Sequence, residues 1–179
     1  MPLPYFGPEG LLPEGIHTAD EVDIQQRLVD EFESSSTRHL LLAGLCQYRS
    51  ELCSMGLRGE QWIDGSFVDQ LRVDPEDIDL VNFCDQILLN RLEPDVQRRA
   101  SILLGSSRET IETYKCHTFV VVKYPDDHPM AEGYEERRRY WRDWFSTPQE
   151  YSLTSKRPAP SRGRKGFVRM ELDSSGDNP

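Results

Sequence analysis

The sequence predicts an α+β (mixed α/β) domain, with a mixed sheet and helices packed mainly on one side of it. Segments with apolar residues at helical spacing alternate with short strand-like runs, and no long parallel crossovers join those runs. The length of 179 residues suits one domain with a substantial core. We therefore expect a single domain over residues 19–172, preceded by an extended segment at 1–18 and followed by a disordered tail at 173–179.

The first part of the chain predicts an extended start and then two helices. Residues 1–15 contain four prolines and three glycines, which disfavour a helix. A first helix is expected over 19–33, beginning at a capping box of Thr18 and Glu21, and a second from the serine cluster to Gly56. Apolar residues recur along both at helical spacing: Val22, Leu28, Val29 and Phe32 in the first, and Leu41, Leu45, Tyr48, Leu52 and Met55 in the second.

The middle of the chain predicts three strands separated by short helical pieces. The strands are expected at 60–63, 78–83 and 114–122, and the last has the strongest pattern because it is rich in β-branched and aromatic residues. Helical or turn segments are expected between and before them, at 67–71, 85–92, 95–104 and 106–112.

The last part predicts an amphipathic helix at 132–145 and a final strand at 166–172, joined by a basic loop at 155–165. Tyr134, Arg138, Trp141 and Phe145 share one face of the helix, and Tyr140 and Trp144 broaden that stripe. Core packing is the favoured interpretation of the stripe, and a groove for a partner is the alternative.

Composition and charge restrict the class of protein. The net charge of −10 argues against a broad surface for nucleic acid, so no DNA partner is expected and a polyanionic substrate must be bound locally. The basic loop favours a solvated segment over a binding patch. The four cysteines show no metal-ligand spacing, and no apolar run or leader suggests a membrane. These features predict a cytoplasmic protein with reduced thiols and no membrane partner.

Two acidic residues at strand spacing form a candidate metal site. Asp77 and Asp79 flank Ile78, so on a strand both carboxylates project to one face while Ile78 enters the other. Like charges one pleat apart repel unless a cation lies between them, and Mg²⁺ is the usual cation of an all-oxygen site. The pair therefore favours a divalent metal site over a solvated strand end.

A Gly-Ser pair, a spacer of ten residues and the Asp-x-Asp pair follow one another at Gly65, Ser66, Asp77 and Asp79. This pattern resembles the DNA polymerase β-like nucleotidyltransferase superfamily. Four blocks that contain or flank it, at 10–17, 64–68, 75–79 and 165–168, resemble a family of small bacterial nucleotidyltransferase-like proteins within that superfamily.

The resemblance implies a minimal nucleotidyltransferase fold and a role for each motif. Gly65 and Ser66 would hold the phosphates of a nucleoside triphosphate, and Asp77 and Asp79 would hold Mg²⁺ or Mn²⁺. Physical chemistry is consistent with both roles, because glycine permits close approach of the backbone, serine supplies a hydroxyl and amides at a helix N-terminus favour an anion. Two carboxylates can hold metal ions that stabilise an in-line displacement at the α-phosphate.

The strand at 114–122 departs from the superfamily, which usually has a third carboxylate there. His117 occupies that position, while Glu112 precedes the strand and Asp126 and Asp127 follow it. Three interpretations of His117 stand: a half-buried structural side chain, a general base, or a ligand for a transition metal. Nucleotide and metal binding are therefore still expected, whereas the sequence does not decide whether the protein is catalytic.

Two functions follow as hypotheses. The first is a metal-dependent transferase that moves a nucleoside monophosphate from a nucleoside triphosphate to a hydroxyl of a protein or RNA; the resemblance implies a bacterial toxin-antitoxin or phage-defence context. The acidic surface favours a protein acceptor over RNA. The alternative is a degenerate, non-catalytic module that acts through a protein partner. In a weaker third hypothesis, the basic loop contacts RNA.

Overall fold

A five-stranded mixed sheet forms the centre of the molecule. The computed structural model describes residues 2–148 and 163–173, and its strands lie in the order β1-β5-β2-β3-β4. β1 is parallel to β5 and β3 is parallel to β4, whereas β2 is antiparallel to both of its neighbours. The parallel connection from β3 to β4 runs through helices at residues 86–115, which corrects the expectation that no long parallel crossover is present. The strands span Gly15–Thr18 (β1), Gly59–Asp64 (β2), Ile78–Asp85 (β3), Cys116–Lys123 (β4) and Gly166–Leu172 (β5).

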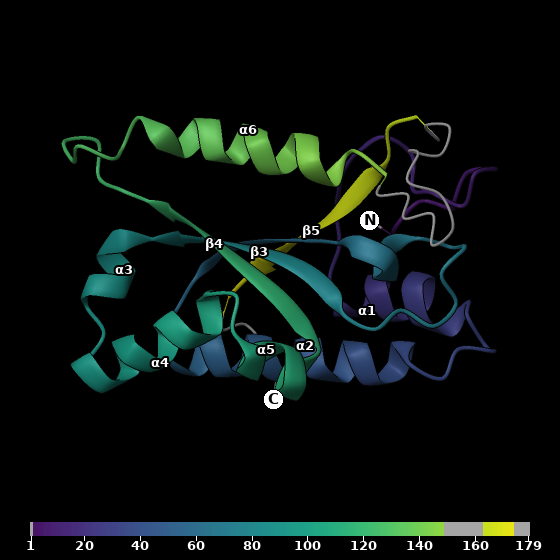
Figure 1. The fold of residues 1–179 in the computed structure, drawn as a ribbon, viewed down its shortest axis with the longest axis horizontal. Helices are drawn as coiled ribbons and strands as arrows, with labels where there is room; N and C mark the ends of the chain where they lie inside the picture. Colours follow the sequence, from purple (N-terminus) through teal and green to yellow (C-terminus); the bar gives the residue numbers. More distant parts are fainter. Residues whose placement is uncertain (1, 149–162, 174–179) are drawn as a thin grey trace.

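Helices cover the two faces of this sheet unequally (Figure 1). α1, α2, α4 and α5 lie on one face, and of the described helices α6 alone covers the other. The predicted class, a mixed sheet with helices mainly on one side, is confirmed. The helices span Glu21–Ile24 (α1), continued by a π-helix at Gln25–Asp30 (η1), Arg38–Ser54 (α2), Gly65–Val68 (η2, a 3-10 helix), Gln86–Asn90 (α3), Pro94–Leu104 (α4), Arg108–Tyr114 (α5) and Gly133–Phe145 (α6).

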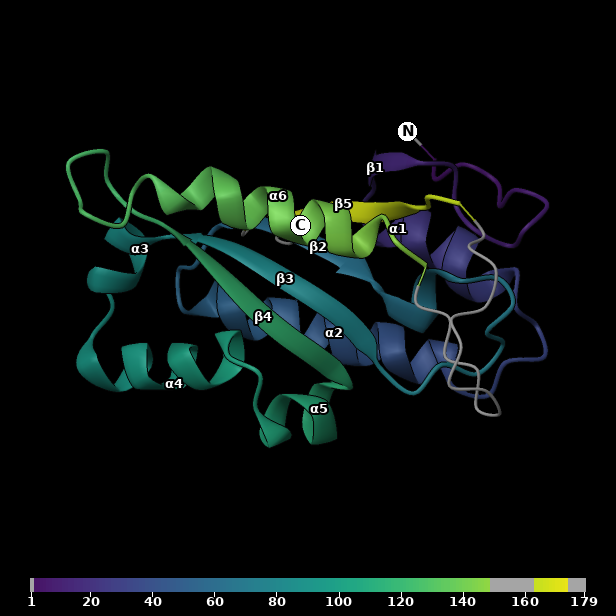
Figure 2. The same cartoon turned by 45° about the horizontal axis from the view of Figure 1, so that its top comes forward.

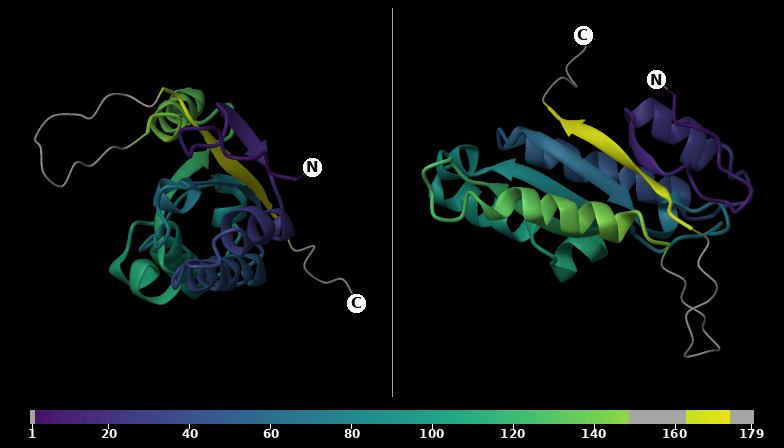
Figure 3. Two further views of the ribbon diagram at one scale, coloured as in Figure 1. Left: turned by 90° about the vertical axis from the view of Figure 1, so that its right-hand side faces the viewer. Right: turned by 90° about the horizontal axis from the view of Figure 1, so that it is seen from above.

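Strand alternation divides the apolar residues between two clusters. Ile78 and Leu80 of β3 point into the main core under α2, whereas Val81 and Phe83 belong to a smaller cluster under α6. Figure 3 shows α6 lying along the strands above this second face. Residues in phase with Val81, such as Asp79, therefore face the α6 side.

The start of the chain is part of the domain, which corrects the predicted boundary at residue 18. Leu3 and Leu12 lie in the main core, and Gly15–Thr18 forms β1, which pairs with β5 at the edge of the sheet (Figure 2). The sequence of β1, Gly-Ile-His-Thr, is too short to show strand alternation, and only its pairing with a strand about 150 residues later makes it a strand.

The first helix also begins later than predicted. Asp20 is its N-cap and accepts a hydrogen bond from the amide of Asp23, whose side chain accepts from the amide of Asp20. The capping box is thus Asp20 with Asp23 instead of Thr18 with Glu21, because Thr18 already belongs to β1. The strand predicted from 114 begins at Cys116, since Tyr114 ends α5 and Lys115 turns the chain with φ +57°.

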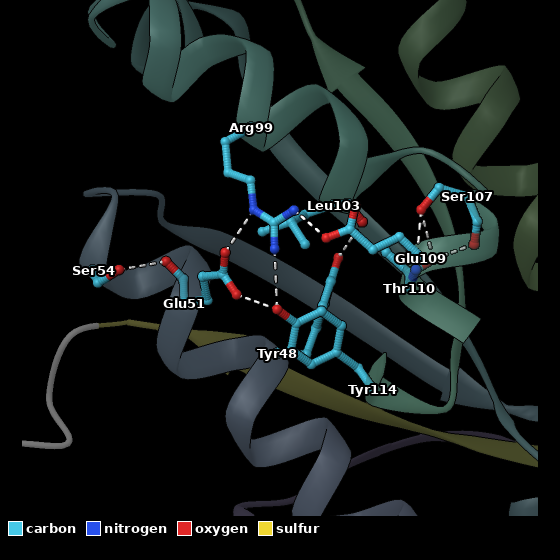
Figure 4. A network of polar contacts seen from close by, with 9 residues as sticks. All are labelled: Tyr48, Glu51, Ser54, Arg99, Leu103, Ser107, Glu109, Thr110 and Tyr114. Carbon is cyan, nitrogen blue, oxygen red and sulfur yellow. Dashed lines mark hydrogen bonds and ion pairs between the residues drawn. The ribbon is translucent and has the colours of Figure 1, made fainter. Parts of the chain in front are cut away.

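A cluster of polar contacts joins three helices beneath the sheet (Figure 4). Arg99 of α4 donates to Glu51 of α2 at 2.8 Å and to the hydroxyl of Tyr114 at 3.2 Å, and it also pairs with Glu109 of α5. Hydrogen bonding from Arg99 is the largest cause that holds the pKa of Glu51 below its ordinary value. These contacts connect the helices that support β3 and β4 from below.

On the other face, α6 is attached to the sheet by charge as well as by apolar packing. The carboxylate of Glu60 on β2 lies 2.8 Å from Arg138 of α6 and 2.7 Å from Arg169 of β5. The Arg138 guanidinium also lies over the rings of Trp62 and Phe83, at 4.9 and 4.6 Å from their centroids. α6 is therefore held in one position over the sheet.

Two further features bear on the sequence predictions. Within residues 2–148 and 163–173, no helix has both the length and the apolar composition needed to cross a membrane. The four cysteines are free thiols. Most of the predicted basic loop, at 155–162, and the predicted tail after residue 173 lie outside the described residues.

Candidate functional site

Three polar side chains form a row across one end of the sheet. Asp64, the last residue of β2, is the register partner of Asp79 on β3, and Asp79 is the register partner of His117 on β4. Register partners on neighbouring strands project to the same face, which here is the face covered by α6. The sheet thus brings together two of the predicted residues and adds Asp64.

A pocket of about 560 Å³ lies over this row. Such a volume falls in the range of small-molecule and cofactor sites. All five residues predicted for the site line it: Gly65, Ser66, Asp77, Asp79 and His117. The other lining residues are Leu11, Asp64, Asp69, Arg72, Asp74, Pro75, Glu76, Phe119, Trp144, Phe145, Pro148 and Lys165.

The two predicted metal ligands lie close together, although only one is on a strand. β3 begins at Ile78, so Asp77 belongs to the preceding loop. Burial is the largest cause that raises the pKa of both carboxyls; the charge of Asp77 raises that of Asp79 further, and His117 opposes the shift at each. The pocket thus holds two carboxylates that a cation would stabilise.

His117 faces the pocket beside Asp79. Its Nδ1 lies 3.2 Å from Oδ1 of Asp79, and its side chain is 35% exposed. The imidazole ring packs against Phe119 with the centroids 4.6 Å apart. If Nδ1 carries the proton in this contact, the neutral ring keeps Nε2 as an acceptor. Of the nearby acidic residues, Glu112 is on α5 and pairs with Arg108, and Asp126 follows the far end of β4, so neither replaces His117 in the row.

Asp64 of the row forms a buried ion pair that the sequence does not predict. Nζ of Lys165 lies 2.5 Å from Oδ1 of Asp64, and both side chains are 5% exposed. Burial raises the pKa of Asp64 to about 7, while Lys165 and the Gly65 amide act in the opposite direction. The charge of Lys165 also lowers the pKa of Asp79. The two residues are 101 positions apart, so local sequence patterns carry no signal for the pair.

Gly65 is required at the turn for two physical reasons. Its φ of +83° lies in the left-handed region, and a Cβ there would collide with the carboxylate of Asp79. The following 3-10 helix, Gly65–Val68, is only four residues long. So short a helix has little dipole, and the prediction of a phosphate site at this turn rests on the backbone of Gly65 and the hydroxyl of Ser66.

Replacing Gly65 by alanine is expected to lower stability and, if the pocket binds Mg²⁺-nucleotide as the sequence predicts, the affinity for that ligand. The backbone strain costs about 1 kcal/mol or more. The added Cβ would displace the Asp79 carboxylate and weaken its contact with the bound cation. Loss of such a charged contact costs about 1.5 kcal/mol or more, which is about tenfold in affinity for the Mg²⁺-nucleotide. Thermal unfolding and calorimetric titration measure the two effects.

Gly56→Ala is the matched control, because Gly56 has φ +82° and nothing within 4 Å of an added Cβ. It should reproduce the loss of stability and leave nucleotide affinity unchanged. Equal loss of affinity in both variants would contradict a specific role for Gly65.

The loop that leads to Asp77 is held by a buried arginine. Arg38, the first residue of α2, has no exposed surface, and burial lowers its pKa to about 10. All five of its guanidinium N–H groups donate to backbone carbonyls. The acceptors are Leu28, Phe67, Asp69, Arg72 and Val73, at 2.8, 2.7, 3.0, 2.6 and 3.1 Å. Three of them belong to the loop between η2 and β3, so Arg38 positions one wall of the pocket.

The donor set fits a cation that is bound together with a ligand. Among the described residues, no group of three or more His, Cys, Asp and Glu side chains could hold a metal ion by itself. Mg²⁺ is usually bound through one or two carboxylates, with phosphates and water completing its shell. Asp77 and Asp79 could supply two such carboxylates, and the remaining ligands would have to come from phosphate and water.

A comparison with known protein families identifies the family of the chain. A family model described as a family of unknown function, DUF6932, matches residues 4–171. No curated protein and no solved structure matches the chain. The family match includes every residue that lines the pocket, and it starts within the N-terminal segment that the structure joins to the domain.

Proposed function

The chain belongs to DUF6932, a family of unknown function, and we propose that it is a metal-dependent nucleotidyltransferase. It would transfer a nucleoside monophosphate from a nucleoside triphosphate to a hydroxyl of a protein or RNA. One observation carries the proposal: the Gly65-Ser66 turn and the carboxylates of Asp77 and Asp79 line the same pocket, although they come from different elements. Localisation in the cytoplasm remains part of the proposal.

Different residues of the pocket would bind the metal and the phosphates of the nucleotide. Asp77 and Asp79 would hold Mg²⁺ or Mn²⁺, and Gly65 and Ser66 would receive the phosphates. When bound, the metal stabilises negative charge on the attacking and leaving oxygens. Arg72 and Lys165 are the Lys and Arg side chains among the lining residues, and they partly balance the charge of the phosphates and carboxylates.

His117 would act as the general base. In this role the imidazole accepts the proton of the acceptor hydroxyl while that oxygen bonds to the α-phosphorus and the bond to pyrophosphate breaks. The contact between His117 and Asp79 supports this role, because the contact orients the imidazole ring. By the resemblance, the superfamily usually has its third carboxylate at this position. A structural role buried in the core is disfavoured, since the ring lines the pocket.

His117→Ala is expected to lower kcat by about 100-fold or more and to leave nucleotide affinity nearly unchanged. His117→Asp, which introduces the usual carboxylate, should retain more activity than the alanine variant. Steady-state kinetics and calorimetry separate the two effects. His128→Ala is the control, because His128 stacks on Tyr124 beyond β4 and is not among the pocket residues. An unchanged kcat in His117→Ala would exclude the general-base role.

We propose a protein as the acceptor in preference to an RNA. The net charge of −10 gives little basis for broad affinity for RNA. A dedicated protein partner, as in a toxin-antitoxin or phage-defence module, agrees with this charge. Arg164 also favours a protein acceptor over RNA, because its charge is partly neutralised by Glu14 and Asp143.

The direct test is incubation with labelled ATP, GTP, CTP or UTP, Mg²⁺ or Mn²⁺, and candidate protein and RNA acceptors. Label should pass to an acceptor with the wild-type protein and not with Asp77→Ala. No transfer from any of the four nucleotides, together with Asp77→Ala indistinguishable from wild type in nucleotide binding, would overturn the proposal.

A non-catalytic binding module is the second candidate. One observation favours it: Asp64 is already paired with Lys165. The resemblance adds that His117 stands where the superfamily usually has a carboxylate. Such a module would bind Mg²⁺-nucleotide without turnover and act through a protein partner. Calorimetry with and without Mg²⁺, followed by product analysis of the same samples, distinguishes it from the enzyme.

A further inference from the structure

The pocket has an aromatic side as well as a charged side. Phe119, Trp144 and Phe145 line it along with the acidic row. Phe145 is buried, and Phe119 packs between His117 and Trp141, with centroid distances of 4.6 Å to each. Trp144 differs from both, because 48% of its surface is exposed.

The exposure of Trp144 corrects the prediction that it broadens the core stripe of α6. Tyr134, Trp141 and Phe145 pack on the cluster beneath the helix, whereas Tyr140 and Trp144 are exposed. The Trp144 ring stacks on the ring of Tyr140, with 6.2 Å between centroids and 20° between planes. A single exposed tryptophan needs no functional explanation, but this one is also a wall of the pocket.

The backbone at Trp144 is anchored to the sheet by neighbouring residues. It lies near the C-terminal end of α6, which Glu60 attaches to the sheet through Arg138. The neighbouring Phe145 is 2% exposed and packs on Phe167 of β5, with the centroids 5.7 Å apart. Because this end of α6 is anchored, less conformational freedom of the backbone is lost when a ligand binds against Trp144.

We propose that Trp144 is the stacking surface for the base of the bound nucleotide, whose phosphates lie at the charged side of the pocket. This inference rests on the proposed function and adds the subsite for the base. Stacking does not depend on hydrogen-bond donors of one particular base, because every base has a π face. The subsite should therefore accept all four bases and bind purines more tightly than pyrimidines, since their larger rings overlap more with the indole.

The test compares Mg²⁺-ATP with Mg²⁺-tripolyphosphate, which has the phosphates and no base. Trp144→Ala should weaken binding of Mg²⁺-ATP by roughly ten- to a hundredfold and leave tripolyphosphate binding unchanged. Trp144→Phe should keep most of the ATP affinity. Tyr5→Ala is the control, because Tyr5 is an exposed aromatic residue that neither lines the pocket nor stacks on Trp144.

Tryptophan fluorescence gives an independent measurement. The chain has three tryptophans, of which Trp62 is buried and Trp141 is half-buried. Mg²⁺-ATP should quench the wild-type emission, and this quenching should be absent in Trp144→Phe even though the nucleotide still binds.

The outcomes separate this inference from the proposed function. If wild type binds both ligands and Trp144→Ala retains full ATP affinity, the stacking subsite is wrong and the proposed function stands. Equal weakening of ATP and tripolyphosphate would also overturn the subsite, because it would show a general disturbance of the pocket. If wild type binds neither ligand, the proposed function fails and the subsite with it.

Discussion

Replacing Asp79 by asparagine is expected to lower the rate of nucleotidyl transfer by at least about 1000-fold. Asp79 is the centre of the polar row, with Asp64 as its register partner on one side and His117 on the other. Asparagine preserves the shape of the side chain and removes the charge that a divalent cation needs. The loss should therefore appear in both metal-dependent nucleotide binding and turnover.

The same substitution should not destabilise the free protein. Burial and the charge of Asp77 raise the pKa of Asp79 above its ordinary value, although His117 and Lys165 oppose the shift. A raised pKa in the folded state means that the ionised carboxylate is less stable in the folded protein than in the unfolded chain. Removing the charge should leave the thermal midpoint equal to or above that of wild type, which makes a loss of activity attributable to the site.

The matched control for Asp79→Asn is Asp126→Asn. Asp126 is exposed in the turn after β4, at the opposite end of the strand from His117. Its replacement makes the same chemical change and should leave binding and turnover unaltered. Thermal shift in a Mg²⁺-nucleotide titration and labelled transfer should be measured in parallel. Retention of full transfer by Asp79→Asn would exclude the proposed metal site.

Replacing Arg38 by methionine is expected to lower the free energy of unfolding by about 3 kcal/mol or more. The five carbonyls that Arg38 satisfies would lose their donors, and each buried acceptor left without a partner costs about 1–3 kcal/mol. Single domains are stable by only about 5–15 kcal/mol, so the variant would lose a large part of its stability. Urea denaturation gives the value directly.

Arg38→Lys and Arg98→Met test the cause of this loss. Lysine has three N–H donors for five acceptors, so it should recover only part of the stability. Arg98 is exposed on α4 and pairs only at the surface with Asp95, so its replacement should cost less than about 0.5 kcal/mol. A loss below about 1 kcal/mol in Arg38→Met would show that the carbonyls find other partners, such as water.

Arg38 also connects stability to the pocket. Its guanidinium holds the carbonyls of Asp69, Arg72 and Val73, which belong to the loop that ends at Asp77. Well below its unfolding temperature, Arg38→Met should therefore bind Mg²⁺-nucleotide more weakly than wild type. Normal affinity in the folded variant would restrict the role of Arg38 to stability.

The elements that could be predicted from the sequence are those with strong local periodicity. The helix α2 and the strand β4 follow from apolar spacing and β-branched composition, and their boundaries differ from the predictions by a few residues. The Gly-Ser and Asp-x-Asp motifs could also be located from the sequence, because they are short and lie at the ends of predicted strands.

Other features depend on residues that are far apart in the chain. Arg38 would be expected on the surface, because arginine is rarely fully buried without partners, and its five partners become neighbours only after folding. The exposure of Trp144 is similar, since the spacing on α6 alone does not show how wide a stripe the sheet can cover. β1 was missed because it is a strand only by virtue of its pairing with β5.

The sequence by itself determined the fold class, most helices and strands, and the motif residues that line the pocket. The tertiary structure alone decided that Asp64 lies beside Asp79, that Lys165 neutralises it and that His117 faces the pocket instead of the core. The physical reason is that helix and strand periodicity is set by the backbone over a few residues. Strand order and register depend on burial and pairing across the whole chain, which no local pattern records.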